Sequence, residues 1–469
     1  MKPTVTLMLW GWIPFVGILF CYFNTRRAVI AAYVLAWLFL PNYTIEFSGL
    51  PEINKVTVAT IGVLMGIAIF DRFCFERWKF SWMDGVALLW CATTVFASLA
   101  NDLGLYDGLS AFKDAILVWF IPYGIGKLYL QDWKAAKELL WGIFLGGLLY
   151  VPFCVVEILM SPQFHNWVYG FHPHEFQQSI RGNSYRPVVF MKHGLMVGMW
   201  MMSASFAGVV LWVCGELPKR WFVSWIPGWL PVLGLILVFI ACKSMASVGY
   251  FFIYTACFFA IRRLNFRIPL KLLLLAPVIY VGLQVSGHFP NKLMIAQVEA
   301  IVGGERAESF VFRIENEEIL IEKAQKKRWL GWGGWGRSRI YDDDGKDISV
   351  TDSLWIIIFG QKGVLGLLAI YGLFALPTAQ VLRNFAKADL KTAKITAFAL
   401  VFLIIAYLND SLLNDMRNPI YLLISGSATA WAGSLVRKWE PQIFPGIGQS
   451  CDAAFLHSSN ISNQSTRYL

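Results

Sequence analysis

The chain alternates between long apolar runs and short polar connections. The runs are continuous and lack the alternation, with a period of two residues, that marks the strands of a membrane barrel. In a bilayer every backbone amide has to be satisfied within its own segment, so these runs predict transmembrane helices. Their approximate cores are 7–23, 28–41, 56–71, 84–100, 113–130, 138–160, 188–214, 222–241, 244–261, 270–287, 352–377, 395–413 and 419–436. The predicted fold class is an all-α polytopic membrane protein with about 12 to 13 transmembrane helices, because the second and third cores fall short of a span of about 20 residues.

One long polar insert, residues 288–351, interrupts the apolar pattern. It is expected to be partly helical, over about 291–302 and again over about 308–329, where apolar residues recur at helical spacing. The insert divides the chain into N-terminal transmembrane helices (1–287), the insert itself, and C-terminal transmembrane helices (352–438). The polar, Ser- and Asn-rich tail at 439–469 is expected to be cytoplasmic and disordered.

Composition supports a membrane protein. The chain is 57% hydrophobic and 15% charged, with a mean hydropathy of +0.55, whereas a soluble domain is about 25% charged. The eight cysteines are scattered without a CxxC pair, so neither a disulfide framework nor a zinc site is predicted. The first apolar run lacks a small-residue cleavage site and is expected to stay as a helix.

The net charge of +10 is interpreted as an orientation signal, which argues against nucleic acid as a partner. Basic residues collect in every second short connection, beginning with Arg26 and Arg27 and ending with Arg437 and Lys438. The positive-inside rule places these connections in the cytoplasm. The insert and the N-terminus are then extracytoplasmic, and the C-terminus is inside.

Four outer segments are expected to converge: 161–187, the turn around Lys243, the insert, and the loop 409–418. Arg186 is either an anchor at the lipid headgroups or a functional charge. Lys243 is either a turn residue or a buried functional charge. The loop sequence around His172 and His174 allows a metal site, although an ordinary interfacial loop explains it as well.

The insert offers three further candidates. Arg313 either forms an ion pair with Glu317 one turn away or binds phosphate through its planar guanidinium. Asp352 either caps the following helix or acts as a general base. The tryptophans of WLGWGGWGRSR belong to an interfacial belt or stack on sugar rings. Asp410, Asp415 and Arg417 lie on the same face and are additional candidates.

The layout resembles the superfamily of O-antigen ligases and Wzy-type O-antigen polymerases. The resemblance covers about half of the chain and rests mainly on Arg313, the WLGWGGWG turn and the later GQKGVLGLL helix. Weaker matches are SYRPVVFMKHG and KSMAS.

The resemblance implies a metal-independent glycosyltransferase without a cofactor, in the bacterial inner membrane and active on the periplasmic side. Such a protein moves a glycan from an undecaprenyl-pyrophosphate carrier to an acceptor hydroxyl on a glycan or lipid, and the resemblance leaves room for a chain-length regulator as a partner. Arg186 and Arg313 would neutralise the pyrophosphate, and Asp352 or His193 would activate the acceptor if a base is needed. The residues expected to bind substrate are Lys243, Arg181, Trp332, Trp335 and Arg337.

This chain departs from the ligase pattern, since ligases carry a histidine where it has Asp352 and Ser353. No RX10G spacing typical of some polymerases is found either. The missing histidine favours a polymerase, while ligase activity stays open. The rival interpretations are a secondary transporter of a small or lipid-linked solute, which fits the number of helices, and a non-catalytic assembly subunit.

Overall fold

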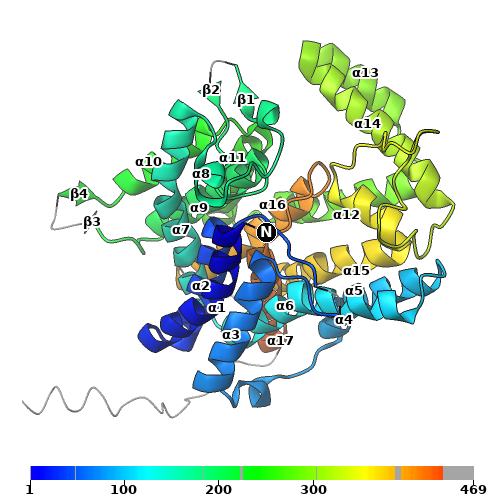
Figure 1. Ribbon diagram of the computed structural model, residues 1–469. Helices are drawn as coiled ribbons and strands as arrows, with labels where there is room; N and C mark the ends of the chain where they lie inside the picture. The colour runs from blue at the N-terminus through cyan, green and yellow to red at the C-terminus, as the bar shows by residue number, and fades with distance from the viewer. Residues whose placement is uncertain are drawn as a thin grey trace, which may run out of the picture.

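The computed structural model describes residues 2–47, 49–182, 184–221, 225–302, 304–385 and 392–436. The tail expected at 439–469 lies outside these residues. The fold is 72% helical (Figure 1), which confirms the predicted helical class. Strands among the described residues form two hairpins, β1 (Ile180–Arg181) with β2 (Ser184–Tyr185) and β3 (Arg220–Trp221) with β4 (Ile226–Pro227).

The α-helices follow the apolar runs in chain order. They are α1 (Pro3–Tyr22), α2 (Thr25–Phe39), α3 (Lys55–Phe70), α4 (Trp82–Leu99), α5 (Leu105–Ala115), α6 (Ile121–Tyr129), α7 (Trp133–Met160), α8 (Phe164–Tyr169), α9 (Gly194–Val213), α10 (Leu230–Ala241), α11 (Met245–Leu264), α12 (Ile268–Ser286), α13 (Asn291–Val302), α14 (Gly304–Gln325), α15 (Leu354–Phe385), α16 (Thr392–Asp410) and α17 (Pro419–Val436). Short turns of other helix types are η1 (Cys74–Arg77), the π-helical η2 (Ile116–Phe120) and η3 (Phe176–Ser179).

Eight helical segments of the described chain are long and apolar enough to cross a membrane, so this is a multi-pass membrane protein. They are α1, α4, the continuous α5–η2–α6, α7, α9, α11, α12 and α15. Helices α3 and α10 are apolar but shorter.

Two helices begin well after the start of their apolar runs, because capping and proline decide where a helix starts. The run expected at 188–214 becomes helical only at Gly194, after His193 has accepted a hydrogen bond from the amide of Leu195 as the N-cap. The run expected at 222–241 becomes helical at Leu230, where Pro231 occupies the first turn. The β3–β4 hairpin precedes it.

Small residues bring helices α6 and α17 into backbone contact. A Cβ added at Gly126 would meet the carbonyl oxygen of Leu423 at 2.2 Å, and one added at Gly426 would meet the carbonyl oxygen of Tyr123 at 1.9 Å. Glycine at such crossings allows the close packing that drives helix association in lipid.

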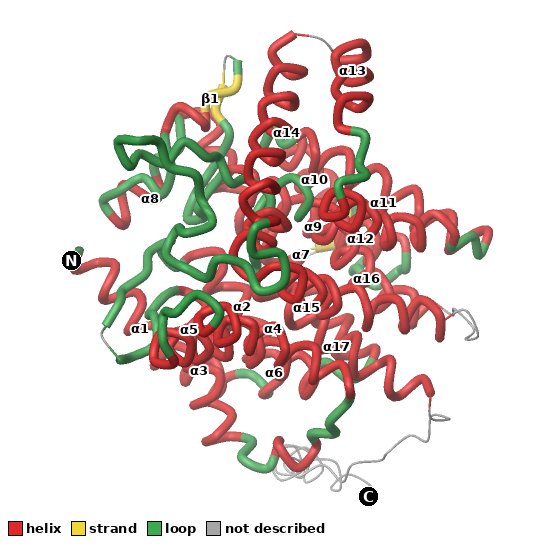
Figure 2. The backbone as a smooth tube through the Cα atoms, turned by 90° about the vertical axis from the view of Figure 1, so that its right-hand side faces the viewer, coloured by secondary structure: helices red, strands yellow, loops and turns green. Residues whose placement is uncertain are grey.

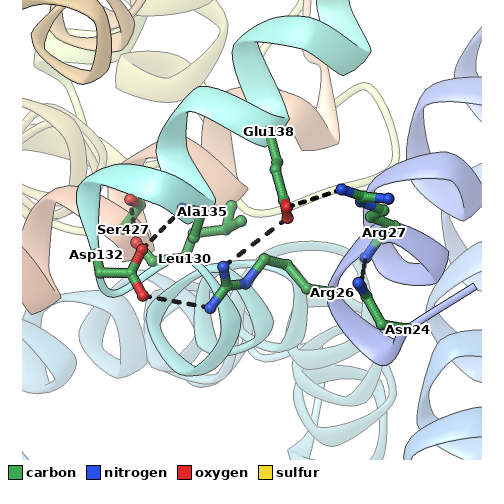
Figure 3. A network of polar contacts seen from close by, with 8 residues as sticks. All are labelled: Asn24, Arg26, Arg27, Leu130, Asp132, Ala135, Glu138 and Ser427. Atoms are coloured by element: carbon green, nitrogen blue, oxygen red, sulfur yellow. Dashed lines mark hydrogen bonds and ion pairs between the residues drawn. The ribbon is translucent and has the colours of Figure 1, made fainter. Parts of the chain in front are cut away.

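Ion pairs join the start of α2 to the start of α7 (Figure 3). Arg26 lies 3.3 Å from Asp132 and 3.8 Å from Glu138, and Arg27 lies 3.5 Å from Glu138. These side chains are partly exposed, so each pair contributes up to about 1 kcal/mol. They tie the start of α2 to the start of α7, and Arg26 and Glu138 also line an open hollow of about 440 Å³ together with Asp71 and Arg77.

The insert contains a helical hairpin that projects from the bundle. Helices α13 and α14 stand beyond the ends of the other helices in both views (Figures 1 and 2). The C-terminal half of α14 returns to the bundle, where Glu317 accepts hydrogen bonds from Tyr280 of α12 and Trp355 of α15. The connection that follows α14 leads back to α15 and brings the insert against the turn between α4 and α5 and against the middle of α15.

Candidate active site

A cavity of about 450 Å³ lies where three segments distant in sequence meet. One wall comes from the β1–β2 hairpin and the residues before α9, a second from α14 and the start of α15, and a third from the α16–α17 connection. Figure 1 shows the hairpin and α14 on either side of that connection. The charged side chains that line the cavity are Arg181, Arg186, Lys192, Arg313, Arg339, Arg417, Asp352 and Asp415. The lining is therefore strongly cationic and suited to an anion.

Arg186 is a buried cation in the first wall. Its side chain lies on Gly194, and its Nη2 donates to the carbonyl oxygen of Lys243 at 3.0 Å. Its Nε is buried without a hydrogen-bond partner among the described residues. Burial and the neighbouring Arg181 lower the pKa of Arg186 to about 10, so it stays charged at neutral pH. An anchor at the headgroups would expose its guanidinium, whereas Arg186 is 7% exposed.

Lys243 and Arg181 hold this wall together. Lys243 occupies the tight turn between α10 and α11, with a positive φ of 52°. Its Nζ donates to the carbonyl oxygen of Arg181 at 2.8 Å, while its own carbonyl accepts from Arg186. The Lys243 side chain is not part of the cavity lining, whereas Arg181 is. Lys243 thus supports the wall from behind.

Arg313 and Asp352 face the cavity from the second wall. The Nε of Arg313 lies 3.5 Å from Oδ2 of Asp352, and their side chains are 38% and 43% exposed. The Arg313 Nη groups have no hydrogen-bond partner among the described residues, so they are open to a ligand. Helix α15 begins at Leu354, which leaves Ser353 and not Asp352 at the N-cap position. Arg186, Arg313 and Asp352 consequently share one cavity.

Glu317 fixes the helix that carries Arg313. It accepts hydrogen bonds from Tyr280 and Trp355, each at 3.2 Å, and from the hydroxyl of Ser353. Within the described part of the chain Arg313 pairs with Asp352 and not with Glu317, so the ion pair expected from their spacing is not realised. Burial raises the pKa of the Glu317 carboxyl. These bonds tie α14 to α12 and α15 one helical turn from Arg313.

The glycine-rich turn of the insert docks on a break in α15. Gly363 has φ 62° and ψ −160° inside that helix. Backbone hydrogen bonds from the turn satisfy the groups released by the break: Trp332 N to Gly360 O, Gly333 N to Gln361 O, Val364 N to Arg328 O and Leu365 N to Trp329 O. Gly331 permits the contact, since a Cβ there would lie 2.4 Å from the backbone carbon of Gln361.

Besides Lys243, three predicted substrate-binding residues lie outside the cavity lining, namely Trp332, Trp335 and Arg337. The indole of Trp332 donates to the carbonyl oxygen of Lys323 at 2.9 Å and packs under the ammonium of Lys327. Trp335 is exposed and donates to Asp107 at 3.0 Å, and Arg337 is exposed. Trp332 therefore has a packing role. Trp335 and Arg337 do not line the cavity, so the structure gives no sign that they bind substrate there.

His193 lines the cavity but uses both ring nitrogens within the protein. Its Nδ1 accepts from the amide of Leu195 at 3.0 Å, so Nε2 carries the proton and faces Oε1 of Gln178 at 3.2 Å. Burial and the neighbouring His174 and Arg186 lower the pKa of His193 to about 4. A neutral imidazole whose lone pair is already engaged is poorly placed to accept a proton, which favours Asp352 as the base.

Sequence reasoning missed Arg339 and named Arg417 only as an additional candidate. Arg339 forms an ion pair with Asp347 at 2.5 Å, and Arg417 forms one with Asp415. Their patterns resemble ordinary surface pairs, and only the fold brings them to the cavity. The described residues contain no group of three or more His, Cys, Asp or Glu able to hold a metal ion. The chain matches no protein-family model and no curated protein.

Proposed function

We propose that the chain is a membrane glycosyltransferase that moves a glycan from an undecaprenyl-pyrophosphate donor to an acceptor hydroxyl. Its reaction would be that of an O-antigen or exopolysaccharide polymerase or of an O-antigen ligase. The observation that carries the proposal is the shared cavity: Arg186 and Arg313 line it from different walls, and Asp352 lies beside Arg313. Guanidinium groups bind phosphate oxygens through paired donors.

The chemistry follows from the charge that the reaction develops. The acceptor oxygen attacks the anomeric carbon, the bond from that carbon to the phosphate oxygen breaks, and undecaprenyl pyrophosphate leaves with one more negative charge. Arg186 and Arg313 stabilise this charge through guanidinium donors that are already in place on two walls of the cavity. Asp352 takes the proton of the acceptor hydroxyl. Since the donor is already activated, orientation within the cavity supplies much of the remaining rate.

In the proposed topology 12 or 13 helices span the bacterial inner membrane. The basic connections, including that of Arg26 and Arg27, face the cytoplasm, and the insert with the cavity faces the periplasm. The donor carries its glycan on this side of the membrane, so its diphosphate would enter the cavity from the outer leaflet.

Replacement of the two arginines tests the proposal. We expect Arg186→Ala and Arg313→Ala each to abolish glycan transfer, because a ligand of the leaving group is lost while the apolar core stays intact. The measurement is polymer or ligated product in a deletion strain complemented with each variant, with membrane levels checked by immunoblot.

Arg337→Ala is the matched control, because this arginine of the same insert is exposed and outside the cavity. Normal product with Arg313→Ala, or an equal loss with Arg337→Ala, would contradict the assignment of the site. The deletion strain also separates the two activities. Single capped units without long chains indicate a polymerase, and accumulated lipid-linked polymer indicates a ligase.

One observation favours the transporter alternative, namely the break in α15 at Gly363, because transporters bind substrate at interrupted helices. Here the glycine-rich turn of the insert satisfies the released backbone groups. Proteoliposomes that take up a solute without producing polymer or ligated glycan would support the transporter.

A further inference from the structure

The arginines of the cavity differ in what already occupies their donors. Arg181, Arg186 and Lys192 have no carboxylate within ion-pair distance among the described residues. Arg417 is held by Asp415 through three contacts: Nε lies 2.8 Å from Oδ1 and 3.1 Å from Oδ2, and Nη2 lies 2.5 Å from Oδ2. The same cavity therefore presents open cations on one wall and a neutralised cation on another.

This pairing changes what Arg417 can bind. A guanidinium grips a phosphate through two parallel N–H donors on one edge. In Arg417 the edge formed by Nε and Nη2 is occupied by a carboxylate that also cancels its charge. Arg313 differs, because its single contact with Asp352 is 3.5 Å long and leaves the Nη groups open. Arg417 is thus a poor ligand for a diphosphate.

Neutral amides line the cavity together with this pair. The Nδ2 of Asn414 donates to the buried carboxyl of Asp410 at 2.9 Å, so its Oδ1 is left for a ligand. Gln361 lines the cavity with a side chain that has no partner among the described residues. The loop that carries Asn414 is anchored, since the carbonyl oxygen of Ser411 accepts from the amide of Leu354 at 3.1 Å. Carboxylates and amides are acceptors for hydroxyl protons, and amides and guanidinium groups donate to hydroxyl oxygens.

We propose that Asp415, Arg417, Asn414 and Gln361 form the subsite for the acceptor, where they bind the hydroxyl groups of a sugar. The diphosphate of the donor then rests on Arg181, Arg186, Lys192 and Arg313. This assignment rests on the proposed glycosyltransferase function and deepens it, because it separates the two substrates within one cavity. Asp352 lines the same cavity, next to Arg313 and shortly before α15, the helix that carries Gln361.

Two binding measurements on the full chain in lipid nanodiscs test the subsite. The first probe is undecaprenyl pyrophosphate. The second is the free oligosaccharide released by mild acid from the lipid-linked donor of the producing strain. We expect Arg417→Gln and Asp415→Asn to weaken oligosaccharide binding about tenfold, since a charged hydrogen bond is lost. The affinity of Arg417→Gln for undecaprenyl pyrophosphate should change by less than about twofold. Arg186→Gln should show the reverse pattern.

Gln361→Ala and Arg417→Lys are milder variants, which show whether a loss of binding comes from the subsite or from misfolding. The first breaks no ion pair, and the second keeps the charge but removes the planar fork; both should also weaken oligosaccharide binding. Unchanged oligosaccharide binding in all four subsite variants would overturn the subsite, as would a loss of undecaprenyl pyrophosphate binding in Arg417→Gln as large as in Arg186→Gln. Failure of the proposed function has a separate signature, which is full affinity for undecaprenyl pyrophosphate in Arg186→Gln.

Discussion

At the scale of single residues, the role of an arginine in this cavity depends on which of its donors are already used. Arg186 is buried with an open Nε, Arg313 touches a carboxylate through one nitrogen, and Arg417 is bound along a whole edge. Identical side chains thus differ in their capacity for phosphate, because a bound carboxylate removes both charge and donors. Residue type alone does not assign a ligand.

Asp352→Asn tests the proposed base. We expect turnover to fall about a hundredfold, since a general base contributes roughly that factor or more. Binding of undecaprenyl pyrophosphate should be kept, because the neighbouring Arg313 is intact. The measurements are product formation with purified protein and donor binding in nanodiscs. Asp347→Asn, which removes the partner of Arg339 instead, is the control. Unchanged turnover in Asp352→Asn would leave the carboxylate without a catalytic role.

His193 predicts a pH dependence of stability. Its pKa is lowered to about 4 by burial first and then by neighbouring positive groups, whereas an unfolded histidine titrates near about 6.5. As the pH falls from about 6.5 to about 4 the unfolded state binds the proton first, so stability is lost over this range. An asparagine at this position would keep the N-cap without titrating, so His193→Asn should flatten the loss. Thermal unfolding in detergent at pH 7 and pH 5 measures it. If His193→Asn loses as much thermal stability between pH 7 and pH 5 as the unchanged protein, His193 is not the cause of the pH dependence.

At the scale of elements, the insert is fixed to the bundle by two different devices. Glu317 holds α14 to α12 and α15 through side-chain hydrogen bonds. The glycine-rich turn holds the break of α15 through backbone hydrogen bonds. Glu317 lies one helical turn from Arg313, and the break borders the cavity at Gly360 and Gln361, so the geometry of the second wall depends on both devices.

Gly331→Ala tests the second device. Gly331 has a φ of +70°, and an added Cβ would lie 2.4 Å from the backbone of Gln361. The substitution should cost on the order of 1–3 kcal/mol and displace the turn, which a lower melting temperature and weaker glycan transfer would reveal. Gly334→Ala is the matched control, since nothing lies within 4 Å of its added Cβ. Equal melting temperatures of the two variants would contradict the proposed docking.

At the scale of the whole molecule, the orientation of the bundle decides which substrates reach the cavity. We expect a cysteine placed at Asp343, in the exposed part of the insert, to react with a membrane-impermeant maleimide in cells with a permeabilised outer membrane. A cysteine at Lys134, in the first turn of α7, should react only after lysis, because the proposed topology places the basic connection at this end of the helix in the cytoplasm. Labelling of Lys134→Cys in unlysed cells would reverse the proposed topology.

The sequence predicted the helices well because lipid leaves apolar runs few alternatives. It missed the start of α9 and α10, where His193 and Pro231 set the boundary. For the site, the resemblance selected Arg186 and Arg313, and the fold places both at one cavity. The position of Arg417 at the cavity depends on tertiary contacts, and the N-cap of α15 depends on a shift of one residue, which no spacing rule resolves.

The docking of the glycine-rich turn also limits how this protein can be rearranged. If residues 328–333 were removed or exchanged with those of another protein, two amides and two carbonyls of α15 would lose their partners at the break. Each buried polar group left without a partner costs about 1–3 kcal/mol. A chimera that carries a foreign insert should therefore assemble only if it also carries the matching stretch of helix around Gly363. The turn and the broken helix have to be exchanged together.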